Sequence, residues 1–225
     1  PSPLENALSG ITQVSISNMD EAGLPPSLVA TASKSVVGSL VGSLDEGGLS
    51  KNQIGGALKN ITSKAVDSLD QIEGISPSDI TSSLKEITSG ATSALDQIEV
   101  SDYSASDLGE MVQEISSGAT QALGNIEIDG ISSDNLSSMM EKVTAGATGA
   151  LGQISMEGYS SSNLTTMLSK ITSGATSALG DIEMEGYSSD NLSLMVEKIT
   201  SGATSALDEI QLEGFSSDNL SSMVQ

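Results

Sequence analysis

The sequence of 225 residues contains no Cys, His, Trp or Arg, and its aromatic residues are one Phe and three Tyr. Without Cys the chain has no disulfide and no thiolate metal site. Without His, Cys and Arg it also lacks the usual general base, thiol nucleophile and anion clamp of active sites. Its many Ser residues would need a neighbouring base to act as nucleophiles. We therefore expect no catalytic residues and a protein that is not an enzyme.

Basic residues are also few, because eight Lys oppose 30 acidic residues and the net charge is -22. A surface this acidic repels nucleic acid and anionic membranes, so we expect neither as a partner. We find no run of about 18 apolar residues, which predicts that no segment inserts into a membrane. The composition, together with a start at Pro1 without an initiator Met, favours an extracytoplasmic location, at the cell surface or in the periplasm.

What the sequence does contain is a repeat. An aliphatic or aromatic residue precedes a Ser-rich start eight times, and the last five intervals between these residues are 28 residues each. The anchors are Leu24, Leu49, Ile75, Tyr103, Ile131, Tyr159, Tyr187 and Phe215. We divide the chain into a divergent N-terminal cap (1–24), a helical array of about seven copies (25–215) and the start of a further, incomplete copy (216–225). Such an ending suggests a piece of a longer array, or an end that docks on another subunit.

Within each copy the apolar residues have helical spacing. In one copy they step by 4, 3, 4, 3 and 4 positions, through Leu136, Met140, Val143, Ala147, Ala150 and Ile154. This spacing is typical of an amphipathic helix packed on other helices. The candidate N-caps are Ser76, Ser104, Ser132, Ser160, Ser188 and Ser216. Between copies, segments such as 72–75 indicate an extended link in which Gly74 is the turn point.

A Gly in the middle of each copy leaves two architectures open. Gly destabilises a helix interior by about 1 kcal/mol relative to Ala. If the helix continues through it, each copy is one helix of about 21 residues, and successive helices form an antiparallel up-down array. If the chain turns at Ser-Gly, each copy is two short helices, and the copies stack. Both are all-α; we favour the second, an α-solenoid of tandem 28-residue helical repeats, because it accounts for both Gly positions of a copy.

The acidic end of a copy is the candidate metal site. Asp181, Glu183 and Glu185 alternate before Gly186, as at the start of an EF-hand calcium loop. The Glu that should close such a loop at its twelfth position is Leu192 in this chain. We therefore keep these three acids as the candidates for Ca²⁺ or another cation, with a solvated acidic edge as the alternative, and expect no other cofactor.

Two further features recur along the copies. Lys142, Lys170 and Lys198 occupy one repeat position, where we expect them to pair with carboxylates on the next copy. Thr172 and Thr176 lie one helical turn apart and recur in line. Such a ladder could bind ice or carbohydrate, although Thr is also an ordinary surface residue.

These observations predict a non-enzymatic, extracytoplasmic repeat scaffold: a surface stalk, an adhesin segment or a filament-forming subunit. The alternatives are a calcium- or other cation-binding repeat module and an intracellular interaction scaffold. An uncapped repeat end exposes apolar surface. We therefore expect a protein partner or self-association through the repeat ends, with the open surface around Ala203 and Leu207.

Overall fold

The computed structural model describes residues 3–98, 103–126, 132–154, 160–182 and 188–210, and these residues contain helices and no strand. The eight α-helices are α1 (Pro3–Ser17), α2 (Pro26–Gly42), α3 (Lys51–Asp67), α4 (Pro77–Ser93), α5 (Ala105–Leu123), α6 (Ser133–Ala150), α7 (Ser161–Leu179) and α8 (Ser189–Ser205). Short 3-10 turns follow several of them: η1 (Asp45–Gly47), η2 (Leu69–Gln71), η3 (Ala94–Gln97), η5 (Leu151–Gln153) and η6 (Ala206–Glu209). The expected all-α repeat fold is confirmed.

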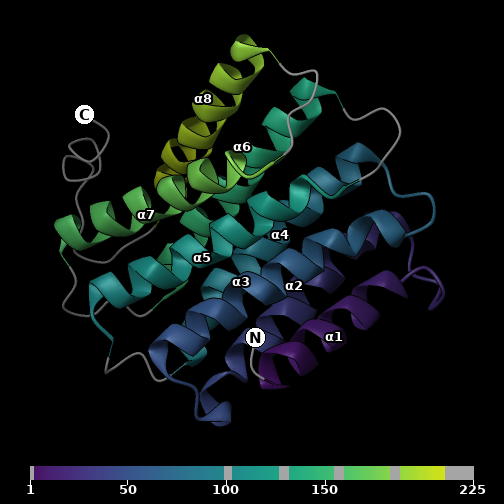
Figure 1. Cartoon of the computed structure of the whole chain (residues 1–225), viewed down its shortest axis with the longest axis horizontal. Helices are drawn as coiled ribbons and strands as arrows, with labels where there is room; N and C mark the ends of the chain where they lie inside the picture. The colour runs from purple at the N-terminus through teal and green to yellow at the C-terminus, as the bar shows by residue number, and fades with distance from the viewer. Residues whose placement is uncertain (1–2, 99–102, 127–131, 155–159, 183–187, 211–225) are drawn as a thin grey trace.

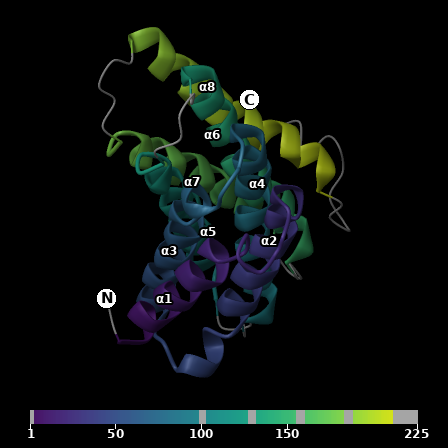
Figure 2. The same cartoon turned by 90° about the vertical axis from the view of Figure 1, so that its right-hand side faces the viewer.

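The helices form two layers, with the odd-numbered helices in one and the even-numbered helices in the other (Figures 1 and 2). Each helix packs chiefly against the helix two places away along the chain, as α5 does against α7 and α6 against α8. Helices that are neighbours in the sequence belong to opposite layers and touch much less. The unit that repeats in space is therefore a pair of copies.

Helices within one layer run parallel. Lys51, at the start of α3, pairs with Asp107 near the start of α5 at 2.9 Å. Asn125, just after α5, donates to Asp67 at the end of α3 at 3.0 Å. A short link cannot span the length of a helix, so the intervening α4 must carry the chain back in the opposite direction.

Each copy is one helix, and the mid-copy Gly does not break it. Helix α6 runs through Gly146 and continues directly into the 3-10 turn η5. The same holds at Gly90 in α4 and Gly202 in α8. The unbroken-helix alternative is thus right, and the turn that we favoured at Ser-Gly is wrong. The physical reason lies in what these glycines touch.

We call the five mid-helix glycines the crossing glycines, because each lies where its helix meets the helix two places earlier. They are Gly90, Gly118, Gly146, Gly174 and Gly202. A Cβ on any of them would lie under 3.0 Å from a backbone carbonyl oxygen of that earlier helix. The carbonyls belong, in the same order, to Lys34, Lys59, Lys85, Gln113 and Glu141. Only Gly allows two backbones to approach this closely, so its role here is in packing and not in turning the chain.

A buried hydroxyl lies beside most of these contacts. Thr62, Thr88, Ser116 and Thr144 are fully buried and border the crossing glycine of the helix two places later. Ser116 and Thr144 also donate across the interface, to the carbonyls of Ile171 and Ile199, both at 2.9 Å. The hydroxyls equivalent to Thr172 and Thr176 are therefore inside the stack in these copies. A continuous Thr ladder on the surface is excluded for that part of the chain.

The helix starts follow the predicted caps. Ser76, Ser104, Ser132, Ser160 and Ser188 each accept from the N–H three residues later, in a capping box. In return, the backbone N–H of the Ser donates to the side chain of that third residue, which is Asp or Asn, for example Asp79 or Asn135. Gly74 has φ 75, which confirms it as a turn point. The cap predicted at Ser216 lies outside the described residues.

The crossing contact can be tested with two alanine substitutions. Gly146→Ala should destabilise the protein, because the new Cβ meets the Lys85 carbonyl and the Thr88 hydroxyl. We expect a loss of about 1–3 kcal/mol, typical of overpacking, in spite of the better helix propensity of Ala. Gly10→Ala is the matched control, since a Cβ there meets nothing within 4 Å. It should stabilise by about 0.5–1 kcal/mol. Chemical denaturation measures both, and equal effects of the same sign would contradict the packing role.

Candidate binding faces

Each helix turns one stripe of residues toward the helix two places later, and we call this stripe its forward face. In α6 the forward face is formed by Leu136, Met140, Thr144 and Thr148, all of them buried, and α8 is the helix that packs most extensively on α6. The equivalent residues of α4 and α5 are buried in the same way: Ile80, Leu84, Thr88 and Thr92, and Leu108, Val112, Ser116 and Thr120. The forward face is therefore the main packing surface of the array.

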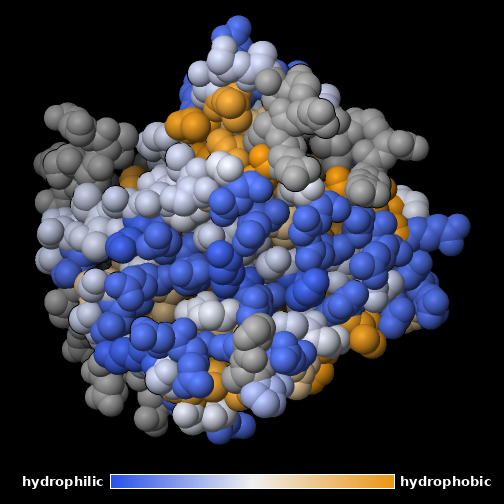
Figure 3. Space-filling model, in the orientation of Figure 1, coloured by the Kyte–Doolittle hydropathy of each residue, from blue (hydrophilic) through white to orange (hydrophobic). Residues whose placement is uncertain are grey.

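Helix α8 has the same stripe but leaves it open. Leu192 is 37% exposed and Val196 is 41% exposed, and Thr200 is also exposed. Figure 3 shows hydrophobic surface around α8, above a broad hydrophilic area over the odd-numbered helices. No helix of the described part of the chain covers this packing surface, and it is the feature there that most resembles a binding site.

The position of the opening differs from our expectation. Ala203 and Leu207 are buried, at 1% and 2% exposure, together with Ile199, Ala206 and Ile210. They pack into the core, and the open stripe is Leu192–Val196. The expectation was wrong because it assumed that each copy packs on the next one. In the structure a copy packs on the second next, which selects another stripe of the helix.

A groove of about 250 Å³ borders the open face, between α7 and α8. Its walls carry hydroxyls and a few apolar groups: Thr165, Leu168, Ser169, Thr172, Thr200, Ala203 and Thr204. The other end of the stack is also partly apolar. There Ile11 and Val14 of α1 and Leu28 of α2 are each more than half exposed.

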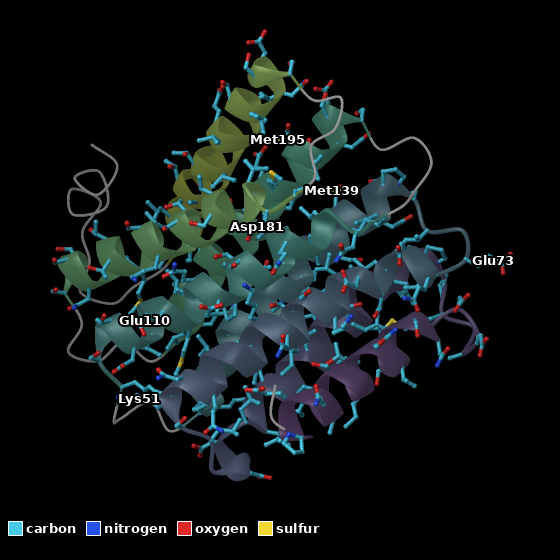
Figure 4. All side chains as sticks on the ribbon, viewed as in Figure 1. Lys51, Glu73, Glu110, Met139, Asp181 and Met195 are labelled. Carbon is cyan, nitrogen blue, oxygen red and sulfur yellow. The ribbon has the colours of Figure 1, made fainter. Side chains whose placement is uncertain are left out.

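A second, larger hollow of about 490 Å³ lies over the first halves of α3 and α5. It is polar, and both charge signs line it: Lys51, Asp107, Glu110, Glu114 and Lys170. Figure 4 shows Lys51 and Glu110 near one another at this end of the odd layer. The ammonium of Lys51 also lies 4.8 Å from the centre of the Tyr103 ring, a favourable cation–π contact.

The Lys51–Asp107 ion pair dominates the electrostatics of this hollow. The hydrogen bond from Lys51, followed by the bonds from the Ser104 backbone and side chain, lowers the pKa of Asp107 to about 2. A carboxyl group with so low a pKa stays ionised at neutral pH and is a poor general acid. The hollow thus presents charges of both signs, with Asp107 paired to Lys51.

One of the repeated lysines forms an ion pair with the neighbouring helix of its own layer. Lys198 of α8 lies 2.8 Å from Glu141 of α6, and this carboxylate raises the pKa of Lys198. Lys34 of α2 pairs with Glu86 of α4 at 2.9 Å. The pairing of Lys with carboxylates on another copy is correct for Lys198. The partner is on the second copy along, and not on the next one as we expected.

The candidate cation ligands are only partly described. Asp181 lies in the turn after α7, where its N–H donates to the Ala178 carbonyl at 3.0 Å. Glu183 and Glu185 lie outside the described residues. Within the described ranges, no three acidic side chains are grouped closely enough to hold a metal ion. Asp181 and Glu73, which follow α7 and α3, lie well apart in Figure 4. Cation binding by the three acids remains a prediction.

One described segment, Pro26–Gly47, is long and apolar enough by composition to span a membrane, with a mean hydropathy of 1.2. It comprises α2 and η1, and Val29, Val37 and Val41 are buried in the core. Core helices can have this composition too, but only 28% of the apolar window of this segment is buried. Ser and Gly interrupt the Val and Leu residues of this stretch, so it contains no long continuous apolar run. The absence of a membrane-inserted segment remains a prediction.

Comparison with known proteins finds no protein family that matches this chain and no curated protein that is detectably similar to it.

The ion pair in the polar hollow predicts a pH-dependent contribution to stability. Asp107→Asn should keep the capping box, since Asn serves at this position in α6, but should lose the pair with Lys51. At pH 7 we expect a loss of less than about 1 kcal/mol, because the pair is partly exposed. The folded-state pKa is depressed, so the contribution is complete above the unfolded value of about 4. It is lost as the pH falls toward about 2.

Denaturation of wild type and variant from pH 7 to pH 2 measures this difference. Asp79→Asn is the control, because it removes a capping carboxylate at the equivalent position of α4 and leaves the Lys51 pair intact. A gap between wild type and Asp107→Asn that does not change with pH would contradict the assignment.

Proposed function

We propose that this chain is a non-enzymatic helical-repeat scaffold that acts through protein–protein association, and that the forward face of α8 is its association surface. The observation that supports the proposal most directly is the exposure of Leu192 and Val196. Their counterparts on α6, Leu136 and Met140, are buried beneath a further helix.

The physical argument is the cost of leaving this stripe in water. Fully burying an exposed Leu or Val side chain is worth roughly 1.5–3 kcal/mol. Because Leu192 and Val196 are 37% and 41% exposed, covering them would contribute about 0.6–1.2 kcal/mol each. The partner that suits the surface is a further helix of the same kind, because α4, α5 and α6 each bind one at this stripe. The net charge of -22 keeps molecules apart at low salt. The extracytoplasmic location and the stalk, adhesin or filament role belong to the same proposal and rest on composition and repetition.

Sedimentation of the whole chain at high protein concentration, in low and in high salt, tests the proposal. We expect association to increase with salt, because salt reduces the Debye length and screens the repulsion between acidic molecules. The double variant Leu192→Ser and Val196→Ser should associate less at every salt concentration. Leu28→Ser, at the opposite end, is a control for general loss of exposed apolar surface.

Association that the double variant leaves unchanged would show that another surface is responsible. A chain that stays strictly monomeric under all conditions and also binds no separate repeat helix would make a passive spacer the better description.

A further inference from the structure

We infer that the forward face of α8 selects a particular helix: one that carries the motif Lys-Ile-x-x-Gly-Ala and crosses α8 with its glycine on the backbone. The inference rests on the proposed function and goes beyond it, because it names what the surface recognises. The evidence is the contact between α6 and α8, in which every component of such a recognition can be seen.

Three components make up the α6–α8 contact. Gly202 of α8 lies against the backbone carbonyl of Glu141 and the hydroxyl of Thr144. That hydroxyl donates to the Ile199 carbonyl at 2.9 Å. Lys198 of α8 reaches the Glu141 carboxylate at 2.8 Å. The incoming helix therefore contributes the Lys198 side chain, the backbone carbonyl of Ile199 and Gly202, all within the sequence Lys-Ile-x-x-Gly-Ala.

The receiving half of this contact is present a second time, on α8 itself. Glu197 occupies the position of Glu141, Thr200 that of Thr144, and Leu192 that of Leu136, each 56 residues later. Glu197, Thr200 and Leu192 are all exposed. The Thr200 hydroxyl bonds to the Val196 carbonyl of its own helix at 3.1 Å, as Thr144 bonds to Met140. The surface is thus prepared for a second helix of the α8 type.

The glycine is common to the contacts within a layer from α2–α4 onward, whereas the lysine distinguishes one contact from another. A crossing glycine is present in every one of the contacts from α2–α4 to α6–α8. The charges vary: Lys34 pairs with Glu86 and Glu141 with Lys198, whereas the same two positions in α4 and α6 are both Lys. We therefore expect loss of the glycine to weaken binding more than reversal of the charge does.

The N-terminal end of a second copy does not offer this motif. In α2 the position of the crossing glycine is Ser39, which is exposed. By analogy with Gly202 on Glu141, its Cβ would be too close to the Glu197 carbonyl. Helix α1 contains no Lys at all. The crossing glycines of a second copy are already covered by that copy's own helices. The fitting occupant is a free or terminal repeat helix with its glycine uncovered.

A labelled synthetic peptide of residues 188–210, titrated into the whole chain and followed by fluorescence anisotropy, tests the inference. The wild-type peptide should bind saturably. Gly202→Val in the peptide should weaken binding roughly 5- to 150-fold, because the overpacking expected at this crossing is worth about 1–3 kcal/mol. Ser201→Val is the matched control: it adds the same side chain at the neighbouring, exposed position and should change the affinity by less than about threefold.

A charge exchange locates the binding surface. Glu197→Lys in the chain should weaken the wild-type peptide severalfold, and Lys198→Glu in the peptide should restore binding to that variant chain. Glu197 lies on an exposed face, so the variant should fold, and its melting curve verifies this.

Equal binding of the Gly202→Val and Ser201→Val peptides would overturn the inference. So would tight binding that ignores Glu197→Lys, since the peptide would then have displaced α8 from α6. Failure of every peptide, with association in sedimentation that still depends on Leu192 and Val196, would overturn the inference and leave the proposed function in place. Peptide binding by a chain that remains monomeric would uphold the inference and exclude a second copy as the partner.

Discussion

The contact between a crossing glycine and a backbone carbonyl two copies earlier sets the spacing of both helix layers. Elsewhere in the core the side chains are aliphatic and small, and the chain has almost no aromatic residues to fill wide gaps. A core built from Leu, Ile, Val, Met and Ala remains closely packed only if its helices are close together. The glycines and the buried hydroxyls beside them allow that approach, so a composition poor in large side chains and the close crossing belong together.

The sequence was sufficient to predict the helices, their caps and the repeat. Period-28 self-similarity, the 4-3-4 spacing around Leu136 and the Ser at each cap are local signals. It was insufficient for the stacking order, because nothing within one copy says whether the next copy or the second next covers it. The error over Gly146 has the same origin: a glycine in a helix interior reads as a break when its neighbour is unknown. The capping boxes were missed in part, although Ser76 and Asp79 are three residues apart, the spacing that signals them.

For the candidate site, too, the sequence predicts the features that follow from repetition and not those that depend on the stacking order. That one end should expose apolar surface follows from repetition alone, and the open face of α8 has this character. Which residues are exposed depends on the packing of each copy on the second next copy. For this reason the exposed apolar residues are Leu192 and Val196, and not Ala203 and Leu207. Ion pairs between helices obey the same register, since Lys198 meets Glu141 two copies back. The acidic segment that begins at Asp181 is only partly described, so cation binding there remains a prediction from the sequence.

The two-layer alternation also constrains how such an array can change in length. Adding or deleting two copies would return every later helix to its own layer, with its surface residues on the same side of the molecule. Adding or deleting a single copy would move every later helix into the opposite layer. Surface features carried by those helices, such as the polar hollow over α3 and α5, would then lie on the other side. The unit that can be added or removed without moving later helices to the other layer is therefore a pair of copies, even though the sequence repeats by single copies.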